Sequence, residues 1–174
     1  YSSLLLSKMC KFVGDEERRK KYGRVYEQAK AAFLKRYYKH GIIESDTETA
    51  YALAYSVGFF TADEIKKRLP EILREKGCLT TGFIGIRFIL PTLCDIGETD
   101  LAYELIAKKE YPSWGYMLEN GATTVWERWN GYTKEDGFED PEMNSFNHYS
   151  LGSCVEWLYS YVLGIKLEED TDEV

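Results

Sequence analysis

The sequence predicts an all-α protein built from helix pairs, and three observations support this fold class. Apolar residues recur every three to four positions through most of the chain, which is the spacing of one helix face. Residues with N-cap side chains precede several of these stretches, and glycines follow them. Residues 110–147 differ, because they show no helical periodicity and contain three of the four tryptophans. We therefore predict an α/α architecture with one long aromatic loop.

Two helices are expected within the first 41 residues. An apolar stretch over residues 4–13 stops at Gly14, and glycine readily adopts the left-handed conformation that follows a helix. Asp15 offers an N-cap for the second helix, which Gly41 ends. His40 is expected in the basic end of that helix, interacting with its dipole. The apolar face of the second helix consists of Tyr22, Val25, Tyr26, Ala29, Phe33 and Tyr37.

Capping boxes predict the next two helix starts. Ser45 with Glu48 has the required spacing, and Thr61 with Glu64 repeats it. Pro70 is expected to kink the second of these helices or to end its first turn, because proline lacks a backbone N–H.

Three further helices complete the prediction. They cover residues 82–94, perturbed by Pro91, residues 99–109, and residues 148–163, which Gly164 closes. The long loop at residues 110–147 is expected to be functional, since its aromatic content argues against disorder.

Composition excludes several classes of function. Hydrophobic residues make up 44% and charged residues 29% of the 174 residues, as in an ordinary globular protein. The net charge of -7 argues against non-specific nucleic-acid binding, and no apolar stretch reaches membrane-spanning length. The high aromatic share, 15%, suits a sugar-binding cleft, because apolar sugar faces stack on aromatic rings.

The cysteines bear on the cellular compartment, and the first residue bears on whether the chain is part of a longer protein. The four cysteines lack metal-site or disulfide-framework spacing, which favours a reducing compartment and a cytoplasmic location. No signal peptide opens the chain, but neither does an initiator methionine, since residue 1 is Tyr1. A helical pattern already runs by Ser3, so the chain is expected to be a piece of a longer protein.

The stretch TTVWERWNG, residues 123–131, holds the first candidate catalytic residue, Glu127. In an extended strand, side chains alternate between two faces. One face would carry Val125, Glu127 and Trp129, and the other would carry Thr124, Trp126 and Arg128. A carboxylate flanked by apolar bulk is partly desolvated, which tunes it for acid–base chemistry. The alternative is an ordinary amphipathic strand whose glutamate reaches solvent.

The stretch MNSFNHYS holds the second candidate, His148, at the start of the last helix. Asn144, Ser145 and Asn147 crowd hydrogen-bonding groups around it, more than one helix cap needs. The alternative is a capping cluster in which Asn147 is the cap. With only two histidines in the chain, we expect no metal site, and no phosphate-binding glycine loop is present.

Carboxylates and aromatic residues are the equipment of glycoside hydrolysis, which needs two carboxyl groups. Glu127 is a candidate for one of them. The other acidic residues of the loop lie in a polar run and are expected to be solvated: Asp136, Glu139, Asp140 and Glu142.

Several motifs together resemble one family. They read ESDTETAYALAYSVG, LTTGFIGIRFILPTL, ETDLAYELI, YPSWGYMLENGATTVWERWNG and PEMNSFNHYSLGSCVEWLYSYVLGI, in this order along the chain. The chain resembles bacterial α-L-rhamnosidases of glycoside hydrolase family 78. The resemblance implies an (α/α)6 toroid that hydrolyses terminal α-L-rhamnosides with inversion. It also implies that Glu127 is the general base, that His148 lines the sugar pocket with Asn147 beside it, and that Trp126 or Trp129 walls this pocket. Trp114 is a weaker candidate for the wall.

The resemblance also implies what lies outside the chain. The family's general acid belongs to a segment upstream of the matched one, so residues 1–174 are expected to be part of a catalytic domain and inactive alone. No cofactor is implied. Helix faces left bare by the missing half are expected to promote self-association.

Local departures from the family pattern concern Asn130, where aspartate is common, and Glu48, where glutamine is common. These departures bear on the aglycone preference that the resemblance implies more than on the type of reaction. Arg128, on the other face of the expected strand, is expected to anchor the loop.

Two rival functions stay open on the residues alone. One is a helical scaffold that binds a protein partner, which the helix pairs suit. The other is a different α/α-toroid enzyme, such as another glycosidase or a polysaccharide lyase, since the NSFNHY stretch could imitate a proton-abstracting site.

Overall fold

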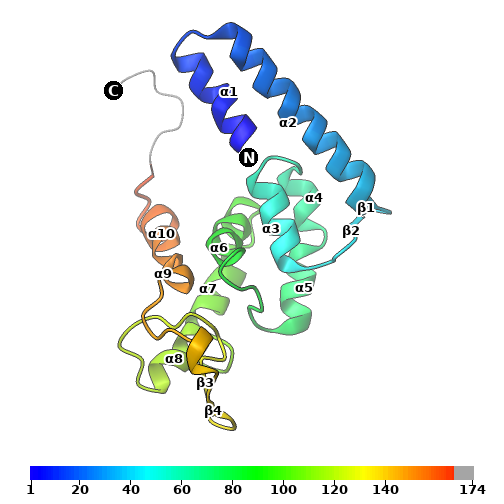
Figure 1. Ribbon diagram of the computed structural model, residues 1–174. Helices are drawn as coiled ribbons and strands as arrows, with labels where there is room; N and C mark the ends of the chain where they lie inside the picture. Colours follow the sequence, from blue (N-terminus) through cyan, green and yellow to red (C-terminus); the bar gives the residue numbers. More distant parts are fainter. Residues whose placement is uncertain (167–174) are drawn as a thin grey trace.

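The computed structural model describes residues 1–166, which are mostly helical (Figure 1). The N-terminal part comprises α1 (Ser2–Phe12), α2 (Glu16–Tyr37), α3 (Glu48–Ser56), α4 (Ala62–Lys66) and α5 (Leu69–Lys76). The C-terminal part comprises α6 (Ile86–Asp95), α7 (Thr99–Ala107), α8 (Trp114–Glu119), α9 (Tyr149–Gly152) and α10 (Cys154–Trp157). Two antiparallel strand pairs are β1 (Tyr38–Lys39) with β2 (Ile42–Ile43), and β3 (Tyr132–Thr133) with β4 (Gly137–Phe138). A 3₁₀ turn, η1 (Pro141–Met143), and a π-helical turn, η2 (Leu158–Val162), complete the elements.

Helices α1 and α2 form a hairpin that stands apart from the other helices (Figure 1). Gly14 turns the chain between them at φ 72°, and the Asp15 side chain accepts a hydrogen bond from Arg18 N at 3.0 Å, as predicted. The expected end of α2 at Gly41 is wrong, however. The helix stops at Tyr37, and His40 and Gly41 form the tight turn between β1 and β2 with φ values of 55° and 84°. His40 therefore does not lie in a helix.

The start of α3 also differs from the prediction. Thr47, not Ser45, caps this helix, because its side chain accepts a hydrogen bond from Ala50 N at 3.3 Å. Glu48 does not reach back to the cap, since its carboxylate is turned inward and is bound elsewhere.

The region around Pro70 behaves as the sequence predicts. Thr61 and Glu64 form the capping box of α4, with each side chain bound to the other residue's backbone N–H. The chain then breaks, and Pro70 lies in the first turn of α5, where a missing N–H costs no helix hydrogen bond.

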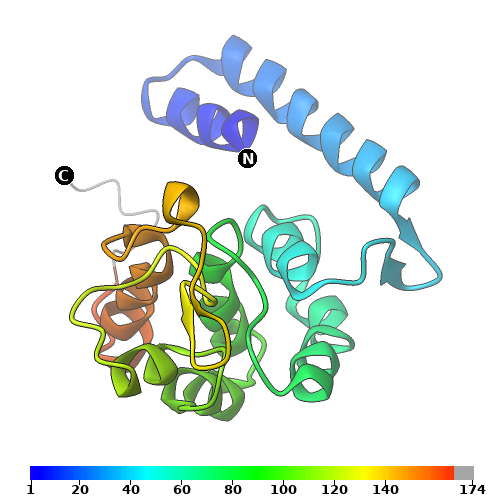
Figure 2. The ribbon, with the colours of Figure 1, turned by 60° about the horizontal axis from the view of Figure 1, so that its bottom comes forward.

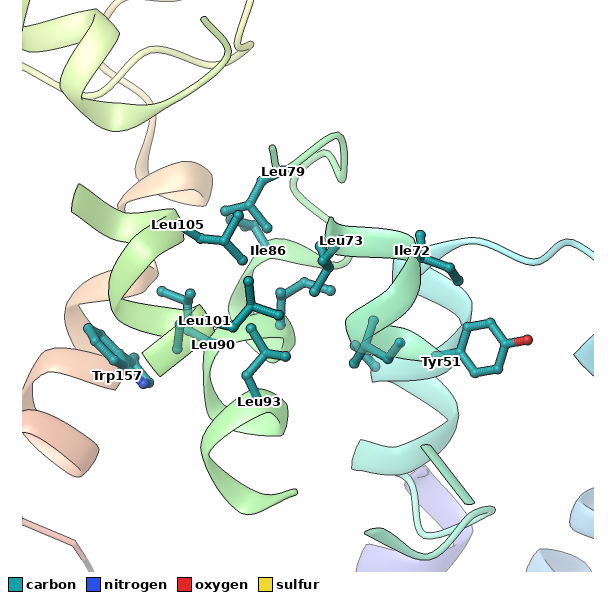
Figure 3. Close-up of a cluster of buried hydrophobic side chains, with 14 of the residues drawn as sticks. Tyr51, Ile72, Leu73, Leu79, Ile86, Leu90, Leu93, Leu101, Leu105 and Trp157 are labelled. Carbon is teal, nitrogen blue, oxygen red and sulfur yellow. The ribbon is translucent and has the colours of Figure 1, made fainter. Parts of the chain in front are cut away.

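The hydrophobic core lies between α3, α5, α6, α7 and α10 (Figure 3). Helix α6 crosses the middle of this core and tolerates Pro91 in its interior. The helices predicted over 82–94 and 99–109 are both present with shorter bounds. The core side chains that Figure 3 labels are Tyr51, Ile72, Leu73, Leu79, Ile86, Leu90, Leu93, Leu101, Leu105 and Trp157.

Two predictions about the C-terminal third need correction. The helix expected over residues 148–163 is divided into α9, α10 and η2, with a turn at Ser153. Residues 110–147 are not free of regular structure, because they contain α8, the β3–β4 pair and η1. Helix α8 has six residues, too few to show a periodic pattern, and is capped by Ser113, which accepts from Tyr116 N at 2.9 Å.

Candidate active site

The segment that carries Glu127 is held against the segment that carries His148. Glu127 N donates to Ser145 O, and His148 N donates to Val125 O, both at 2.9 Å. The Thr124 hydroxyl adds a bond to the carbonyl of Phe146. Residues 123–130 bend and turn along this path, so the regular strand expected from the sequence is wrong. Figure 2 brings this part of the molecule forward.

Glu127 is half-buried, and its orientation is fixed by a backbone donor. Its Oε2 accepts a hydrogen bond from Ser145 N at 2.8 Å. Among the described residues, Ser145 N–H is the one hydrogen-bond donor to the Glu127 carboxylate. Oε1 can therefore accept a proton from a bound water. A carboxylate fixed in this way can act as a proton acceptor.

A cavity of about 530 Å³ opens beside Glu127. Four parts of the chain line it: the connection from α5 to α6, the Tyr111–Pro112 pair, residues 127–130, and Leu151 of α9. Phe83 and Tyr111, which are 61% and 45% exposed, present aromatic surface at this cavity. A half-buried carboxylate beside aromatic rings can bind a sugar, because rings stack on apolar sugar faces.

Trp129 forms a fixed wall of the Glu127 cavity. Its ring is almost buried, and Nε1 donates to the Thr81 carbonyl at 2.8 Å. Trp114 packs edge-on against it with ring centroids 5.1 Å apart, and Trp114 Nε1 donates to Leu151 O at 2.9 Å. Each indole is therefore held by both a ring contact and a hydrogen bond.

Trp126 lies on a different side of the segment. It is 4% exposed, and its ring packs against Phe146 at 5.5 Å and Tyr132 at 6.3 Å. It lines a separate cavity of about 450 Å³ that Phe138 also borders. The structure therefore brings Glu127 and Trp129 together and does not bring Trp126 to the same cavity.

His148 is the N-cap of α9. Its Nδ1 accepts from Ser150 N at 3.2 Å and lies 2.7 Å from the Ser150 hydroxyl, while its ring stacks on Tyr149. A neutral ring that accepts at Nδ1 carries its proton on Nε2, which makes Nε2 a donor. The alternative in which Asn147 is the cap is wrong, because His148 itself is the cap, and Asn147 is exposed. Neither residue lines the Glu127 cavity or the Trp126 cavity.

Of the remaining polar residues, some line the Glu127 cavity and others form hydrogen bonds within residues 110–147. Arg128 lines the Glu127 cavity, so its expected placement on the opposite face is wrong. Asn130 also lines it and donates through Nδ2 to Glu139 Oε1 at 2.7 Å. Asp136 accepts from Thr133 within a turn, and Asp140 caps η1. These contacts give Glu139, Asp136 and Asp140 structural partners inside the loop.

Sequence reasoning missed the contribution of residues 78–83, which line the cavity between α5 and α6. The motif LTTGFIGIRFILPTL pointed to this stretch without assigning it a role. Among the described residues, no group of three or more His, Cys, Asp or Glu side chains is arranged to hold a metal ion. Over the same residues, no helix has both the length and the apolar character needed to cross a membrane.

Residues 1–162 match the family described as bacterial alpha-L-rhamnosidase 6 hairpin glycosidase domain. An α-L-rhamnosidase of Streptomyces avermitilis is 41% identical over 150 residues, which are 83% of this chain and 14% of that protein. An α-L-rhamnosidase of Formosa agariphila is 37% identical over 172 residues, which are 95% of this chain and 18% of that protein. The crystal structure of the Streptomyces avermitilis α-L-rhamnosidase complexed with L-rhamnose matches with a TM-score of 0.88 at 36% identity. This match covers 94% of this chain and 16% of that chain.

These similarities confirm the helical, six-hairpin fold class that the sequence motifs predict. The chain spans less than a fifth of the length of the relatives it matches. The roles expected for Glu127, Trp126, Trp129, Asn147 and His148 stay predictions, which the site geometry supports to different degrees.

Proposed function

The chain belongs to the bacterial α-L-rhamnosidase six-hairpin glycosidase domain family, and from this premise we propose that it supplies the general-base side of an α-L-rhamnosidase active site. The observation that carries this proposal is the position of Glu127. Its carboxylate is held by Ser145 N–H at the edge of an aromatic-lined cavity. The reaction class is the inverting hydrolysis of terminal α-L-rhamnose residues from rhamnosides.

In this mechanism Glu127 is ionised and takes a proton from the water that attacks the anomeric carbon. Inverting glycosidases place the acid on the opposite face of the sugar, with the two carboxyl groups about 6.5–9.5 Å apart to leave room for that water. Asp136, Glu139 and Asp140 have partners within the loop, and we propose that the general acid lies outside residues 1–174.

L-Rhamnose is the sugar bound in the crystal structure of the Streptomyces avermitilis relative, which supports a rhamnoside as substrate. Trp129 would form the wall of the sugar pocket, and Trp126 would support the loop from its other side. His148 lies outside the lining of the Glu127 cavity, and for a sugar that extends to it the free donor would be Nε2, since Nδ1 is occupied by the cap of α9.

The test uses a segment hybrid, in which this chain replaces the matching part of the Streptomyces avermitilis relative. We expect the hybrid to hydrolyse an aryl α-L-rhamnoside, and Glu127→Gln to lower kcat by about 10²–10⁴-fold, the usual contribution of general acid–base catalysis. KM should change little, because the amide still accepts a hydrogen bond. The matched control is Glu135→Gln, an exposed glutamate of the same loop, which should leave kcat unchanged.

Near-normal kcat in the Glu127→Gln hybrid would remove Glu127 from the mechanism. The isolated chain, tested in parallel, should release nothing above background, because one carboxyl group cannot act on both faces of the sugar. Turnover by the isolated chain that Glu127→Gln abolishes would place the general acid within it, with Asp136 and Glu139 as the first suspects.

A further inference from the structure

A buried carboxylate that the proposed mechanism does not use lies at the first residue of α3. Glu48 is 1% exposed, although glutamate is among the residues least often buried. We propose that Glu48 is a positioning residue of the active site, acting through the backbone of Thr80 and Thr81. This inference rests on the function proposed for the Glu127 cavity, and it replaces the expectation that the glutamate at this position affects aglycone preference.

The Glu48 carboxylate is bound at both oxygens. Oε1 accepts from the backbone N–H groups of Thr80 and Thr81, each at 2.7 Å. Oε2 accepts from the Thr80 hydroxyl and from Lys76 Nζ, each at 3.1 Å. A buried carboxylate needs such donors to offset its lost hydration. The two bonds to Oε1 fix two successive peptide groups of the α5–α6 connection in one orientation.

The same two residues connect Glu48 to the cavity. The carbonyl of Thr81 accepts the indole N–H of Trp129 at 2.8 Å, and Trp129 walls the cavity beside Glu127. Thr80 itself lines the cavity. The Thr81 N–H and the Thr81 carbonyl belong to neighbouring peptide groups that share the Thr81 Cα, so a displacement of the first also moves the acceptor of the Trp129 indole. Glu48 thus sets the wall of the site without touching the cavity.

Helix α3 holds the α5–α6 connection at a second point, next to Glu48. The hydroxyls of Thr49 and Thr81 are 2.6 Å apart. Gly85 packs so closely that an added Cβ would lie 2.1 Å from Thr81 Oγ1 and 2.9 Å from Thr49 Cγ2. The connection therefore fits α3 in one geometry, which is what a positioning role requires.

Two substitutions distinguish the effect of the Glu48 side-chain length from the effect of its charge. Glu48→Gln keeps an oxygen in place for both backbone N–H groups and loses the charge pair with Lys76. Glu48→Asp keeps the charge but withdraws the carboxylate by one carbon–carbon bond, about 1.5 Å. Aspartate is also favourable in the first turn of a helix, so α3 should form in both variants.

The first measurement is the indole ¹H–¹⁵N signal of Trp129 in the labelled chain, assigned by its loss in Trp129→Phe. We expect Glu48→Gln to retain this signal. Glu48→Asp should shift it and speed exchange of the Thr81 amide by about threefold to tenfold, as for the loss of one hydrogen bond. Lys76→Met removes the ion pair and the bond from Nζ to the Thr80 hydroxyl but keeps both backbone bonds to Glu48, so it should leave the signal in place. An unmoved signal in Glu48→Asp, or an equal shift in Glu48→Gln, would overturn the proposal.

The second measurement is kinetic, in the segment hybrid. Glu48→Asp should lower kcat by as much as about 10²-fold, the cost of a misplacement near 1 Å, while Glu48→Gln keeps most of the activity. A shifted indole signal with unchanged kinetics would overturn the role in catalysis. If the unsubstituted hybrid is inactive, the proposed function fails, and the indole signal still decides whether Glu48 positions Trp129.

Discussion

Helix α2 and residues 110–147 differ in both the regularity of their backbone and the burial of their side chains. Helix α2 has 22 residues of regular structure, and none of them is buried. The other region has only short elements, yet it buries large side chains at Tyr116, Met117, Trp126 and Trp129. In this chain, a regular helix can be exposed and an irregular segment can bury its side chains. The candidate site lies in the irregular segment with buried side chains.

The difference follows from the contacts that hold each region. Helix α2 is stabilised by its own backbone hydrogen bonds and by packing on α1. It contacts the core through Phe33 and Leu34, and the end of α3 through bonds such as that from Tyr26 to Val57 O. Residues 110–147 depend on partners distant in sequence, as in the bond from Trp129 to Thr81. Long-range contacts can place a carboxylate and a ring together with the precision that catalysis needs.

The largest effect on the free energy of unfolding is expected from a substitution at a buried position of residues 110–147. Trp126→Ala should lower the free energy of unfolding by about 3–5 kcal/mol, because it removes a buried ring from between Phe146 and Tyr132. Val25→Ala, at a 46% exposed position of α2, should change it by less than about 0.5 kcal/mol. Urea unfolding monitored by circular dichroism measures both. Equal losses at the two positions would show that burial does not distinguish the regions.

The same contrast explains what the sequence could predict. The Asp15 cap and the capping box of Thr61 with Glu64 are confirmed, because each joins residues three positions apart and has no competing cap residue beside it. The cap of α3 was assigned to Ser45 instead of Thr47, since both have suitable side chains and only packing decides between them. The turn at His40 was missed because the helical pattern of α2 runs directly into it.

Parts of the site could not be predicted for a related reason. Glu127 was singled out by its apolar neighbours, which are local. The partners of Glu48 lie 32 and 33 residues away, so no local pattern reveals them. Trp126 and Trp129 resemble each other in sequence, and only the fold separates them into two cavities.

A smaller effect is expected where α2 meets the core. The Tyr26 hydroxyl donates to Val57 O at 2.9 Å and lies 3.0 Å from Gly58 O. Tyr26→Phe removes this contact and should cost about 0.5–1.5 kcal/mol. The loss should appear as faster amide hydrogen exchange in α1 and α2, with α6 unchanged, because the hairpin can open without unfolding the core. Equal acceleration in α6 would mean that the hairpin and the core unfold as one unit.

The smallest effect concerns Asp46, which lies in the connection from β2 to α3. Arg68 donates to Asp46 Oδ2 at 2.7 Å and to Oδ1 at 3.1 Å, and Tyr51 OH donates to Oδ1 at 2.9 Å. The hydrogen bonds from Arg68, with a further one from Tyr51, lower the pKa of Asp46. A carboxyl group whose pKa is lower in the folded state stabilises that state above its unfolded pKa, about 3.9, and this stabilisation is lost as the pH falls through the folded pKa.

Asp46→Asn should remove this contribution, and asparagine tolerates the positive φ of 42° at this position. Both partners are partly exposed, with side-chain exposures of 34% for Asp46 and 24% for Arg68, so we expect a difference of only about 0.2–1 kcal/mol at neutral pH. Other carboxyl groups titrate over the same range, and the useful quantity is the difference in unfolding free energy between the two proteins at each pH. That difference should be constant above about pH 5 and shrink as the pH falls below about 3.9, because the asparagine variant has no proton to gain at this position. A difference that stays constant down to pH 2 would show that the charge of Asp46 does not stabilise its contact with Arg68.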